Sequence, residues 1–225
     1  MHLVSSNAHT DYARENAAMR IAIIGAGNVG SSLGTGWSRK GHQIVFGVRD
    51  LSSPETGLLS RVAGSTALAP EEATASAEVV ALTVPWSAAE QVVKSLGNLQ
   101  GKVLLDCTNP VMAWPNLDHA GGKSGGEQVA EWATGGRVVK IFNTTGFENM
   151  ADSNYPGGKL TMFYASDDFS AKRIAHELAE DLGFEAQDVG PLKQSYLLEV
   201  LASLWGSLAY GQKLGRGIGF RLLRR

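Results

Sequence analysis

A glycine-rich turn near the start of the chain constrains the fold more than any other feature. An apolar run, Ile21–Ile24, leads into the pattern Gly25-Ala-Gly27-Asn-Val-Gly30, which is typical of a buried strand that turns sharply into a helix. Gly25 permits the tight turn, Gly27 leaves room for an anion at the backbone, and Gly30 lets the helix pack on the strand. A second strand at 43–48 completes a βαβ unit. The segment therefore predicts a dinucleotide pyrophosphate at the helix start, against the alternative of a purely structural glycine turn.

Short apolar strands alternate with helical patterns along the rest of the chain. Unbroken apolar strands in such an alternation favour an α/β fold with a mostly parallel sheet covered on both faces. The expected strands are 20–24, 43–48, 78–84, 102–106, 137–142, 160–164 and 184–188. The expected helices are 28–40, 56–63, 87–96, 126–133, 170–182 and a long final helix over 192–214.

Local signals indicate where several helices begin and how the last one packs. Ser87-x-x-Glu90 and Ser124-x-x-Glu127 both fit a capping box, and Asp167 or Asp168 can cap the next helix. The final helix carries a broad apolar face, which predicts burial against the sheet or against another subunit. A homodimer is therefore expected. The residues of this face are Leu197, Val200, Leu201, Leu204, Trp205 and Leu208.

The chain divides by pattern into three parts. Residues 1–18 lack the positive start and apolar core of a secretory signal and are expected to form a flexible extension. Residues 19–150 hold the predicted dinucleotide-binding domain, and residues 151–225 a small C-terminal portion packed on it. No low-complexity linker separates them.

Composition excludes several classes of function. The net charge of −2 over 225 residues gives no reason to expect nucleic acid or a membrane surface as a partner. The single cysteine, Cys107, cannot form an internal disulfide or build a metal site alone, which fits the reducing cytoplasm. No apolar run approaches the roughly 20 residues of a membrane span.

The end of the second strand bears on the choice of nucleotide. An acid about 20 residues beyond the glycines binds the ribose 2′-hydroxyl of NAD, whereas an arginine accommodates the 2′-phosphate of NADP. Here Gly47 lies nearest the acid position and Arg49 follows, with a planar fork that suits a phosphate. Asp50 competes one residue further on. The pattern favours NADP over NAD, with a solvated loop arginine as the alternative reading of Arg49.

The third strand ends in the run Val84-Pro85-Trp86, where Pro85 stops the hydrogen-bonded ladder. Ligands of α/β proteins bind at the carboxyl ends of such strands. Trp86 is expected there as one wall for a flat ring, because Gln91 is a poor hydrophobic partner for it on the following helix. Packing of Trp86 into the core is the equally open alternative.

Two further strand ends place polar side chains at the same edge of the sheet. Asn109 follows the strand at 102–106, while Asn143 and Thr144 follow the strand at 137–142. Amide and hydroxyl groups of this kind can bind a nicotinamide carboxamide, a ribose or a substrate ring. Each of them can equally be a turn-former that satisfies its own backbone.

No residue is predicted to be catalytic, and no metal ligands are predicted. His42 is expected to be structural, His176 is expected to be solvated, and His119 is kept as a possible proton donor. No nucleophile elbow, His-x-x-x-His pair or convincing acid–base pair is present. Hydride transfer between two flat rings needs stacking, orientation and exclusion of water, and depends less on protein acids than carbonyl reduction does.

Several segments together resemble the NADPH:F420 oxidoreductases, over roughly residues 19–223. The cytosolic domain of the membrane ferric reductases of the STEAP type is similar in the same regions. The segments that carry the resemblance are 19–30, 41–49, 82–86, 190–192 and 214–223.

The resemblance implies a Rossmann-type, doubly wound sheet with a small C-terminal portion. It also implies hydride transfer between the C4 atom of NADP(H) and C5 of a deazaflavin, coenzyme F420, or another flavin-like acceptor. Arg49 would meet the 2′-phosphate, and Pro85 and Trp86 would border the two rings. By the same resemblance the pyrophosphate would be held at Gly25, Gly27, Asn28, Val29 and Gly30.

Two other functions remain open. β-Hydroxyacid dehydrogenases and pyrroline-carboxylate reductases share the glycine fingerprint but add a large helical substrate domain, and here too few residues remain for one. A non-catalytic NADP-binding protein is the other alternative, which Trp86 and the polar strand ends disfavour.

Overall fold

A six-stranded parallel sheet forms the centre of the molecule, and the computed structural model describes residues 18–50, 62–113, 116–117 and 122–225. The strands lie in the order β3-β2-β1-β4-β5-β8, and every neighbouring pair is parallel. This is the order of a doubly wound Rossmann sheet, so the predicted fold class is confirmed. The strands are β1 (Arg20–Ile24), β2 (Gln43–Gly47), β3 (Thr66–Leu68), β4 (Val79–Leu82), β5 (Val103–Asp106) and β8 (Arg137–Lys140).

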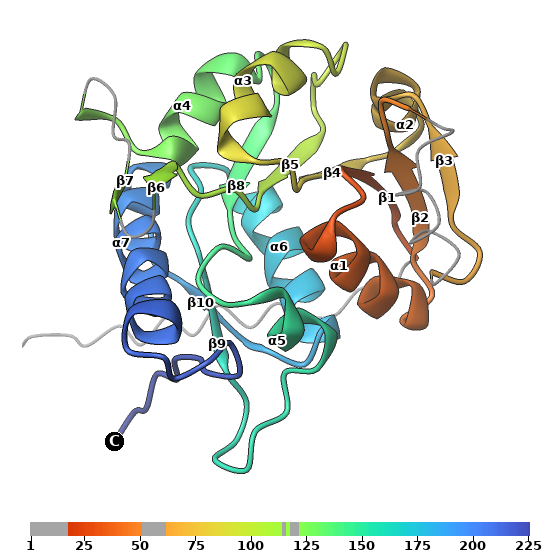
Figure 1. Cartoon of the computed structure of the whole chain (residues 1–225). Helices are drawn as coiled ribbons and strands as arrows, with labels where there is room; N and C mark the ends of the chain where they lie inside the picture. Colours follow the sequence, from red (N-terminus) through yellow and green to blue (C-terminus); the bar gives the residue numbers. More distant parts are fainter. Residues whose placement is uncertain (1–17, 51–61, 114–115, 118–121) are drawn as a thin grey trace, which may run out of the picture.

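Alternate side chains of β1 enter two separate cores, because successive residues of a strand point to opposite faces. Ile21 and Ile23 pack with α1 (Asn28–Arg39) and α6 (Phe169–Asp181). Ala22 and Ile24 pack with the helices of the other face. Figure 1 shows the two layers, with α2, α3 and α4 on one side of the sheet and α1, α5 (Phe147–Ala151) and α6 on the other. The helices of the first layer are α2 (Pro70–Ser76), α3 (Trp86–Lys94) and α4 (Gly125–Trp132).

The C-terminal part adds a second parallel pair, β9 (Thr161–Tyr164) and β10 (Glu185–Asp188), and an isolated antiparallel bridge between Lys140 and Ala165 connects it to β8. Leu178 and Phe184 belong to the same core as Ile23. The predicted division near residue 150 thus separates segments that share one apolar core, and it stays a prediction.

The final helix is present but is not one uniform helix. It consists of a 3₁₀ turn at Leu192–Gln194, α7 at Ser195–Gly206 and a π-helical stretch at Ser207–Gly211. The expected end at residue 214 was three residues too late. Figure 1 shows α7, in blue, beside β6 (Val111–Ala113) and β7 (Asn116–Leu117).

Several short elements escaped prediction. The strands β3, β6 and β7, and the helices α2 and α5 (Phe147–Ala151), carry few apolar residues in a regular pattern. Proline in the first turn of α2, followed by Glu71 and Glu72, was the available signal for that helix.

Some expectations fall wholly or partly outside the described residues. They are the extension at 1–18 (apart from residue 18), most of the helix expected at 56–63, and His119. None of the helices in the described ranges has the length and apolar character that spanning a bilayer requires. The same ranges contain no cluster of His, Cys, Asp or Glu residues arranged to hold a metal ion.

Candidate functional site

The turn between β1 and α1 is held by hydrogen bonds from the neighbouring strand. Gly25 has a φ of +110°, a conformation that side chains rarely allow, and its N–H donates to the carbonyl of Gly47 at 3.2 Å. The hydroxyl of Thr83 donates to the carbonyls of Ile24 and Gly25, at 3.0 and 2.9 Å. The turn is therefore built by β1, β2 and β4 together. Thr83 is a residue that the sequence patterns did not single out.

The other two glycines differ in what surrounds them. A Cβ atom on Gly30 would lie 2.2 Å from the carbonyl oxygen of Gly25, so only glycine allows α1 to pack this closely. A Cβ atom on Gly27 would meet nothing within 4 Å. Gly27 thus borders open space at the start of α1, where backbone N–H groups can receive an anion.

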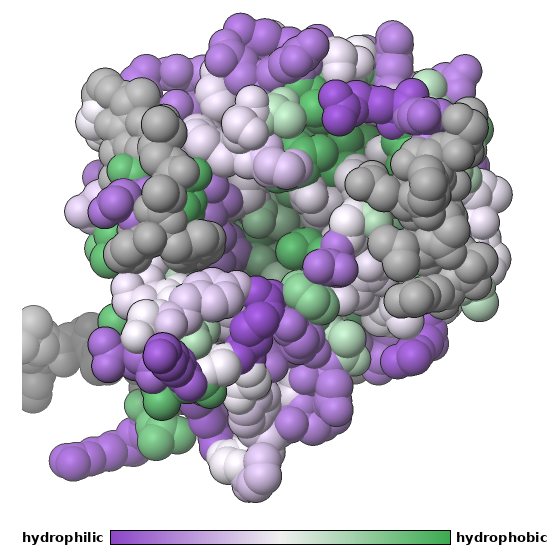
Figure 2. Space-filling view, in the orientation of Figure 1, coloured by the Kyte–Doolittle hydropathy of each residue, from purple (hydrophilic) through white to green (hydrophobic). Residues whose placement is uncertain are grey.

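A cavity of about 500 Å³ lies over this turn. It joins the glycine turn to the end of β2 and to the segment after β4. Figure 2 shows the hollowed centre of this face, with apolar residues on its floor. The lining residues are Ile24, Gly25, Ala26, Gly27, Gly47, Val48, Arg49, Asp50, Pro70, Thr83, Val84, Pro85 and Val92.

Five of the predicted site residues line this cavity and seven do not. The lining includes Gly25, Gly27, Arg49, Val84 and Pro85. The other predicted residues lie outside the lining, in α1, at the start of α3 or at the ends of β5 and β8: Asn28, Val29, Gly30, Trp86, Asn109, Asn143 and Thr144.

Arg49 lies two residues after the end of β2 and is exposed, as is Asp50 beside it. Both lie in the cavity lining. A guanidinium fork at the end of the second strand is the arrangement that receives a 2′-phosphate.

Trp86 begins α3 instead of preceding it. Pro85 occupies the N-cap position and no side chain caps the helix, so the capping box predicted at Ser87 was wrong. Ser87 lies within the first turn, where it cannot cap. The Trp86 ring packs against Trp132 of α4, with ring centroids 5.3 Å apart. This contact corresponds to the core reading of Trp86, and the capping box at Ser124 is confirmed.

Asn109 and Asn143 bind each other across the ends of β5 and β8. The amide of Asn109 donates to the backbone carbonyl of Asn143, and the amide of Asn143 donates to Oδ1 of Asn109, both at 3.0 Å. Within the described residues, Oδ1 of Asn143 is buried without a hydrogen-bond partner. The preceding residue, Phe142, has a φ of +59°, which is strained for a bulky side chain. Thr144 is buried beside this turn.

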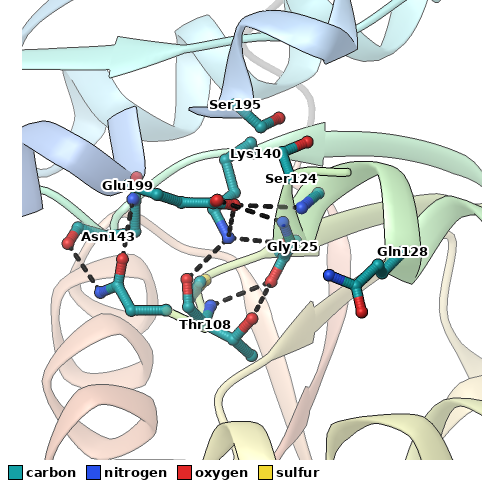
Figure 3. A network of polar contacts seen from close by, with 12 residues as sticks. Thr108, Ser124, Gly125, Gln128, Lys140, Asn143, Ser195 and Glu199 are labelled. Carbon is teal, nitrogen blue, oxygen red and sulfur yellow. Dashed lines mark hydrogen bonds and ion pairs between the residues drawn. The ribbon is translucent and has the colours of Figure 1, made fainter. Parts of the chain in front are cut away.

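A charged cluster that sequence reasoning missed lies directly behind these asparagines. Nζ of Lys140 lies 2.9 Å from Oδ2 of Asp106 and 3.2 Å from Oε1 of Glu199, and all three side chains are fully buried. The same ammonium donates to the carbonyl of Thr108 at 2.7 Å. Figure 3 shows Lys140 between Glu199 of α7 and Thr108 after β5. We refer to Asp106, Lys140 and Glu199 as the charged cluster.

The charged groups of the cluster also have hydrogen-bond partners outside it. Glu199 also accepts hydrogen bonds from the backbone N–H groups of Gly125 and Gly126, both at 3.1 Å, at the start of α4. Burial acts to lower the pKa of Lys140, but the carboxylates of Asp106 and Glu199 outweigh it and hold that pKa above its ordinary value. The ammonium therefore stays charged in the interior.

Burial and the neighbouring carboxylate of Asp106 raise the pKa of Cys107, so its thiol stays protonated.

The sequence does carry a signal for the charged cluster, namely a charged residue inside an otherwise apolar strand or helix. Examples are Val138-Val139-Lys140-Ile141 and Leu197-Leu198-Glu199-Val200.

The histidines have structural contacts. His42 is buried, accepts from the backbone N–H of Met19 at 3.1 Å and lies 2.9 Å from Asp181, in agreement with its predicted structural role. The prediction that His176 is solvated was wrong, because its ring lies 3.1 Å from the hydroxyl of Tyr164 and is only partly exposed.

The strand order, the glycine turn and the cavity above it define a dinucleotide-binding Rossmann protein. Residues 20–110 match the family model described as NADP oxidoreductase coenzyme F420-dependent. The chain is 30% identical over 222 residues to the F420-dependent NADP reductase of Methanothermobacter thermautotrophicus, covering 91% of this chain and 94% of the relative. It belongs to the family of F420-dependent NADP reductases and is an NADP-dependent oxidoreductase.

Two other relatives extend this picture. The crystal structure of a proposed F420-dependent NADP reductase from Arthrobacter sp. FB24 has a TM-score of 0.84 and 26% identity, and the alignment covers 92% of this chain and 100% of that one. Metalloreductase STEAP3 of Rattus norvegicus is 28% identical over 82% of this chain. The chain spans only 36% of that longer protein.

Proposed function

We propose that this enzyme transfers a hydride between NADP(H) and a deazaflavin, coenzyme F420, or a flavin-like acceptor. The observation that carries the proposal is the cavity that runs from the open side of Gly27 to Arg49, in a chain of this family. In the direction of F420 reduction, NADPH gives up a hydride and oxidised F420 takes up that hydride and one proton. The products are NADP⁺ and reduced F420.

The nucleotide half of the site uses backbone more than side chains. Gly25, Gly27 and Gly30 shape the turn, and the N–H groups at Asn28 and Val29 begin the helix that would face the pyrophosphate. Arg49 would pair with the 2′-phosphate at the other side of the cavity. The absence of a Cβ at Gly27 supports this fit, because any side chain there would project into the space that the pyrophosphate needs.

The ring half of the site would lie toward β4, β5 and β8. Val84 and Pro85 line the cavity and offer an apolar edge to a nicotinamide ring. Asn109, Asn143 and Thr144 follow the next two strands and would border this half of the site, with Asn109 and Asn143 hydrogen-bonded to each other. These residues would orient two rings and exclude water, which is what hydride transfer requires of a protein.

Cofactor preference tests the nucleotide half. Wild-type protein is expected to bind NADPH at least tenfold more tightly than NADH, since an Arg–phosphate pair contributes about 1.5–3 kcal/mol. Arg49→Ala should remove most of that preference. Isothermal titration calorimetry measures both, with Arg39→Ala, an exposed arginine at the end of α1, as the matched control. Equal affinity of the wild type for NADPH and NADH contradicts the assignment of the 2′-phosphate site.

Turnover tests the acceptor. NADPH is mixed with enzyme and oxidised F420, FMN or FAD, and the loss of acceptor absorbance is followed. Reduction of F420 faster than of either flavin supports the deazaflavin, whereas no turnover with any of the three contradicts the proposed reaction and leaves NADP binding to be explained otherwise.

We further propose that the enzyme is a homodimer joined through α7. Leu198 and Trp205 of this helix are buried in the subunit, while its other side exposes Leu197, Val200 and Leu204 at 54%, 41% and 49%. Apolar side chains at this spacing form a continuous stripe, which a second copy would cover. Light scattering should give a dimer for the wild type and a monomer for Leu197→Glu/Leu204→Glu. A monomeric wild type contradicts the proposal.

A further inference from the structure

A continuous chain of polar contacts leads from helix α7 to Asn143. Glu199 on α7 contacts Lys140 on β8, and Lys140 donates to the carbonyl of Thr108 just after β5. The next residue, Asn109, exchanges hydrogen bonds with Asn143. Figure 3 shows Glu199, Lys140, Thr108 and Asn143 of this series in one view.

Thr108 is held from two sides in this chain of contacts. Oδ1 of Asp106 accepts from both the backbone N–H and the hydroxyl of Thr108, at 2.9 and 2.6 Å. The ammonium of Lys140 donates a hydrogen bond to the backbone carbonyl of Thr108. Every polar group of Thr108 is thus tied to the charged cluster, so the position of Asn109 depends on where Lys140 and Asp106 sit.

The Asn143 side of the contacts carries strain and an unused acceptor. Phe142 adopts a left-handed φ of +59°, and its ring packs edge-on against Trp37 at 5.6 Å. Asn143 is only 4% exposed, and its Oδ1 has no hydrogen-bond partner among the described residues. Strained backbone and unsatisfied buried polar atoms persist where surrounding contacts over-determine them, and they concentrate at functional sites.

Stability alone does not account for a buried cluster of this kind. Replacing a buried ion pair by apolar residues of similar volume is often neutral or stabilising. Here the three charges sit at one junction between β5, β8, α4 and α7. The positions of these three charges therefore constrain the segments that follow β5 and β8, which carry Asn109 and Asn143.

We propose that Asp106, Lys140 and Glu199 are positioning residues that fix the Asn109–Asn143 pair, and with it the ends of β5 and β8 that would border the ring of the hydride acceptor. This rests on the proposed function for the identity of the ligand. Because Glu199 belongs to α7, the position of α7 also affects the geometry of the Asn109–Asn143 pair.

The test that needs no ligand is amide hydrogen exchange of the whole chain carrying Glu199→Gln. This substitution keeps the shape of the side chain and removes its charge. The backbone amides at 141–146 are expected to exchange about tenfold faster, a change within the range of pairwise couplings. The amides at 25–30 should exchange as in the wild type. Glu131→Gln, an exposed residue of α4, is the matched control and should change neither segment.

A double-mutant cycle with Asn143→Ala separates positioning from general destabilisation. Glu199→Gln alone is expected to lower kcat/KM for F420 about tenfold while the Kd for NADPH changes less than twofold. In the Asn143→Ala background, the same change should have no further effect, because its target is already gone. Should Glu199→Gln fail to fold, Asp106→Asn replaces it in both measurements.

The outcomes are distinguishable. Unchanged exchange at 141–146, or effects that multiply in the double variant, overturn the positioning role. Absence of turnover with F420, FMN and FAD in the wild type overturns the proposed function, and the exchange experiment still decides the positioning.

Discussion

The glycine turn and the charged cluster support the same edge of the sheet by opposite means. The turn is made of six consecutive residues, Gly25 to Gly30, and acts through its backbone. The cluster is made of three side chains from β5, β8 and α7 that lie far apart in the chain. A local motif can be recognised from the sequence, whereas a cluster of this kind forms only when the strands and helices pack together.

The two regions should also fail differently. Substitutions in the turn change the space available to backbone and ligand. Substitutions in the cluster leave a charge uncompensated in the interior, which costs more free energy than a steric change of one methyl group.

The largest effect is expected for Lys140→Met. It leaves the carboxylates of Asp106 and Glu199 buried without their cation, so the free energy of unfolding should fall by about 3–5 kcal/mol. Urea unfolding at pH 7 measures this. The double variant Lys140→Met/Glu199→Gln should recover part of the loss, because it removes one of the two uncompensated charges. A loss below about 1 kcal/mol in the single variant would mean that solvent reaches the cluster.

Gly30→Ala comes next. Its Cβ would lie 2.2 Å from the carbonyl oxygen of Gly25, which cannot move without opening the turn. Overpacking of this kind costs about 1–3 kcal/mol of unfolding free energy. Thermal or urea unfolding measures this loss. An unfolding midpoint of Gly30→Ala equal to that of the wild type would show that α1 can shift away from β1.

Gly27→Ala is the matched contrast in the same turn. No atom lies within 4 Å of the added Cβ, and the φ of −70° suits alanine. Stability should stay within about 0.5 kcal/mol of the wild type. The Kd for NADPH should rise at least about tenfold, if the Cβ enters the space of the pyrophosphate. Unchanged affinity would place the pyrophosphate elsewhere.

The smallest effect is expected at the partly exposed pair of Glu148 and Arg216, whose side chains are 38% and 34% exposed. Partial burial acts to raise the pKa of Glu148, but its hydrogen bonds to Arg216 outweigh burial and lower that pKa. A lowered folded pKa contributes stability above the ordinary value of 4.5, and this contribution is lost as the pH falls through the folded value.

Glu148→Gln should therefore cost at most about 1 kcal/mol at pH 7, because solvent screens the pair. The difference from the wild type should shrink toward zero as the pH falls below the folded pKa of Glu148, where both proteins lack the charge. Urea unfolding at pH 7 and over a series of acidic pH values checks the sign, and a difference that grows on acidification would contradict it.

Much of the sheet could be predicted because its strands are apolar runs separated by helical patterns. The seven expected strands are all present, one or two residues shorter at their ends in most cases. Helix α2 was missed because Ala73 and Thr74 are its only buried residues, too few for a periodic signal. The start of α3 was misplaced because Pro85 and Trp86 can open a helix without a side-chain cap.

The candidate site divides along the same line. Gly25, Gly27, Arg49, Val84 and Pro85 were predicted and do share a cavity, since the carboxyl ends of parallel strands must meet at one edge. Trp86 could face either the cavity or Trp132, and only packing of α3 on α4 decided between them.

The sequence by itself determined the alternation of strands and helices, the glycine turn and the position of Arg49, because these depend on neighbouring residues and on backbone conformation. The tertiary structure alone decided that Lys140 meets Asp106 and Glu199, and that Asn109 pairs with Asn143. The physical reason is that a buried charge is tolerated only beside its partner, and which partner it finds is set by how distant elements pack.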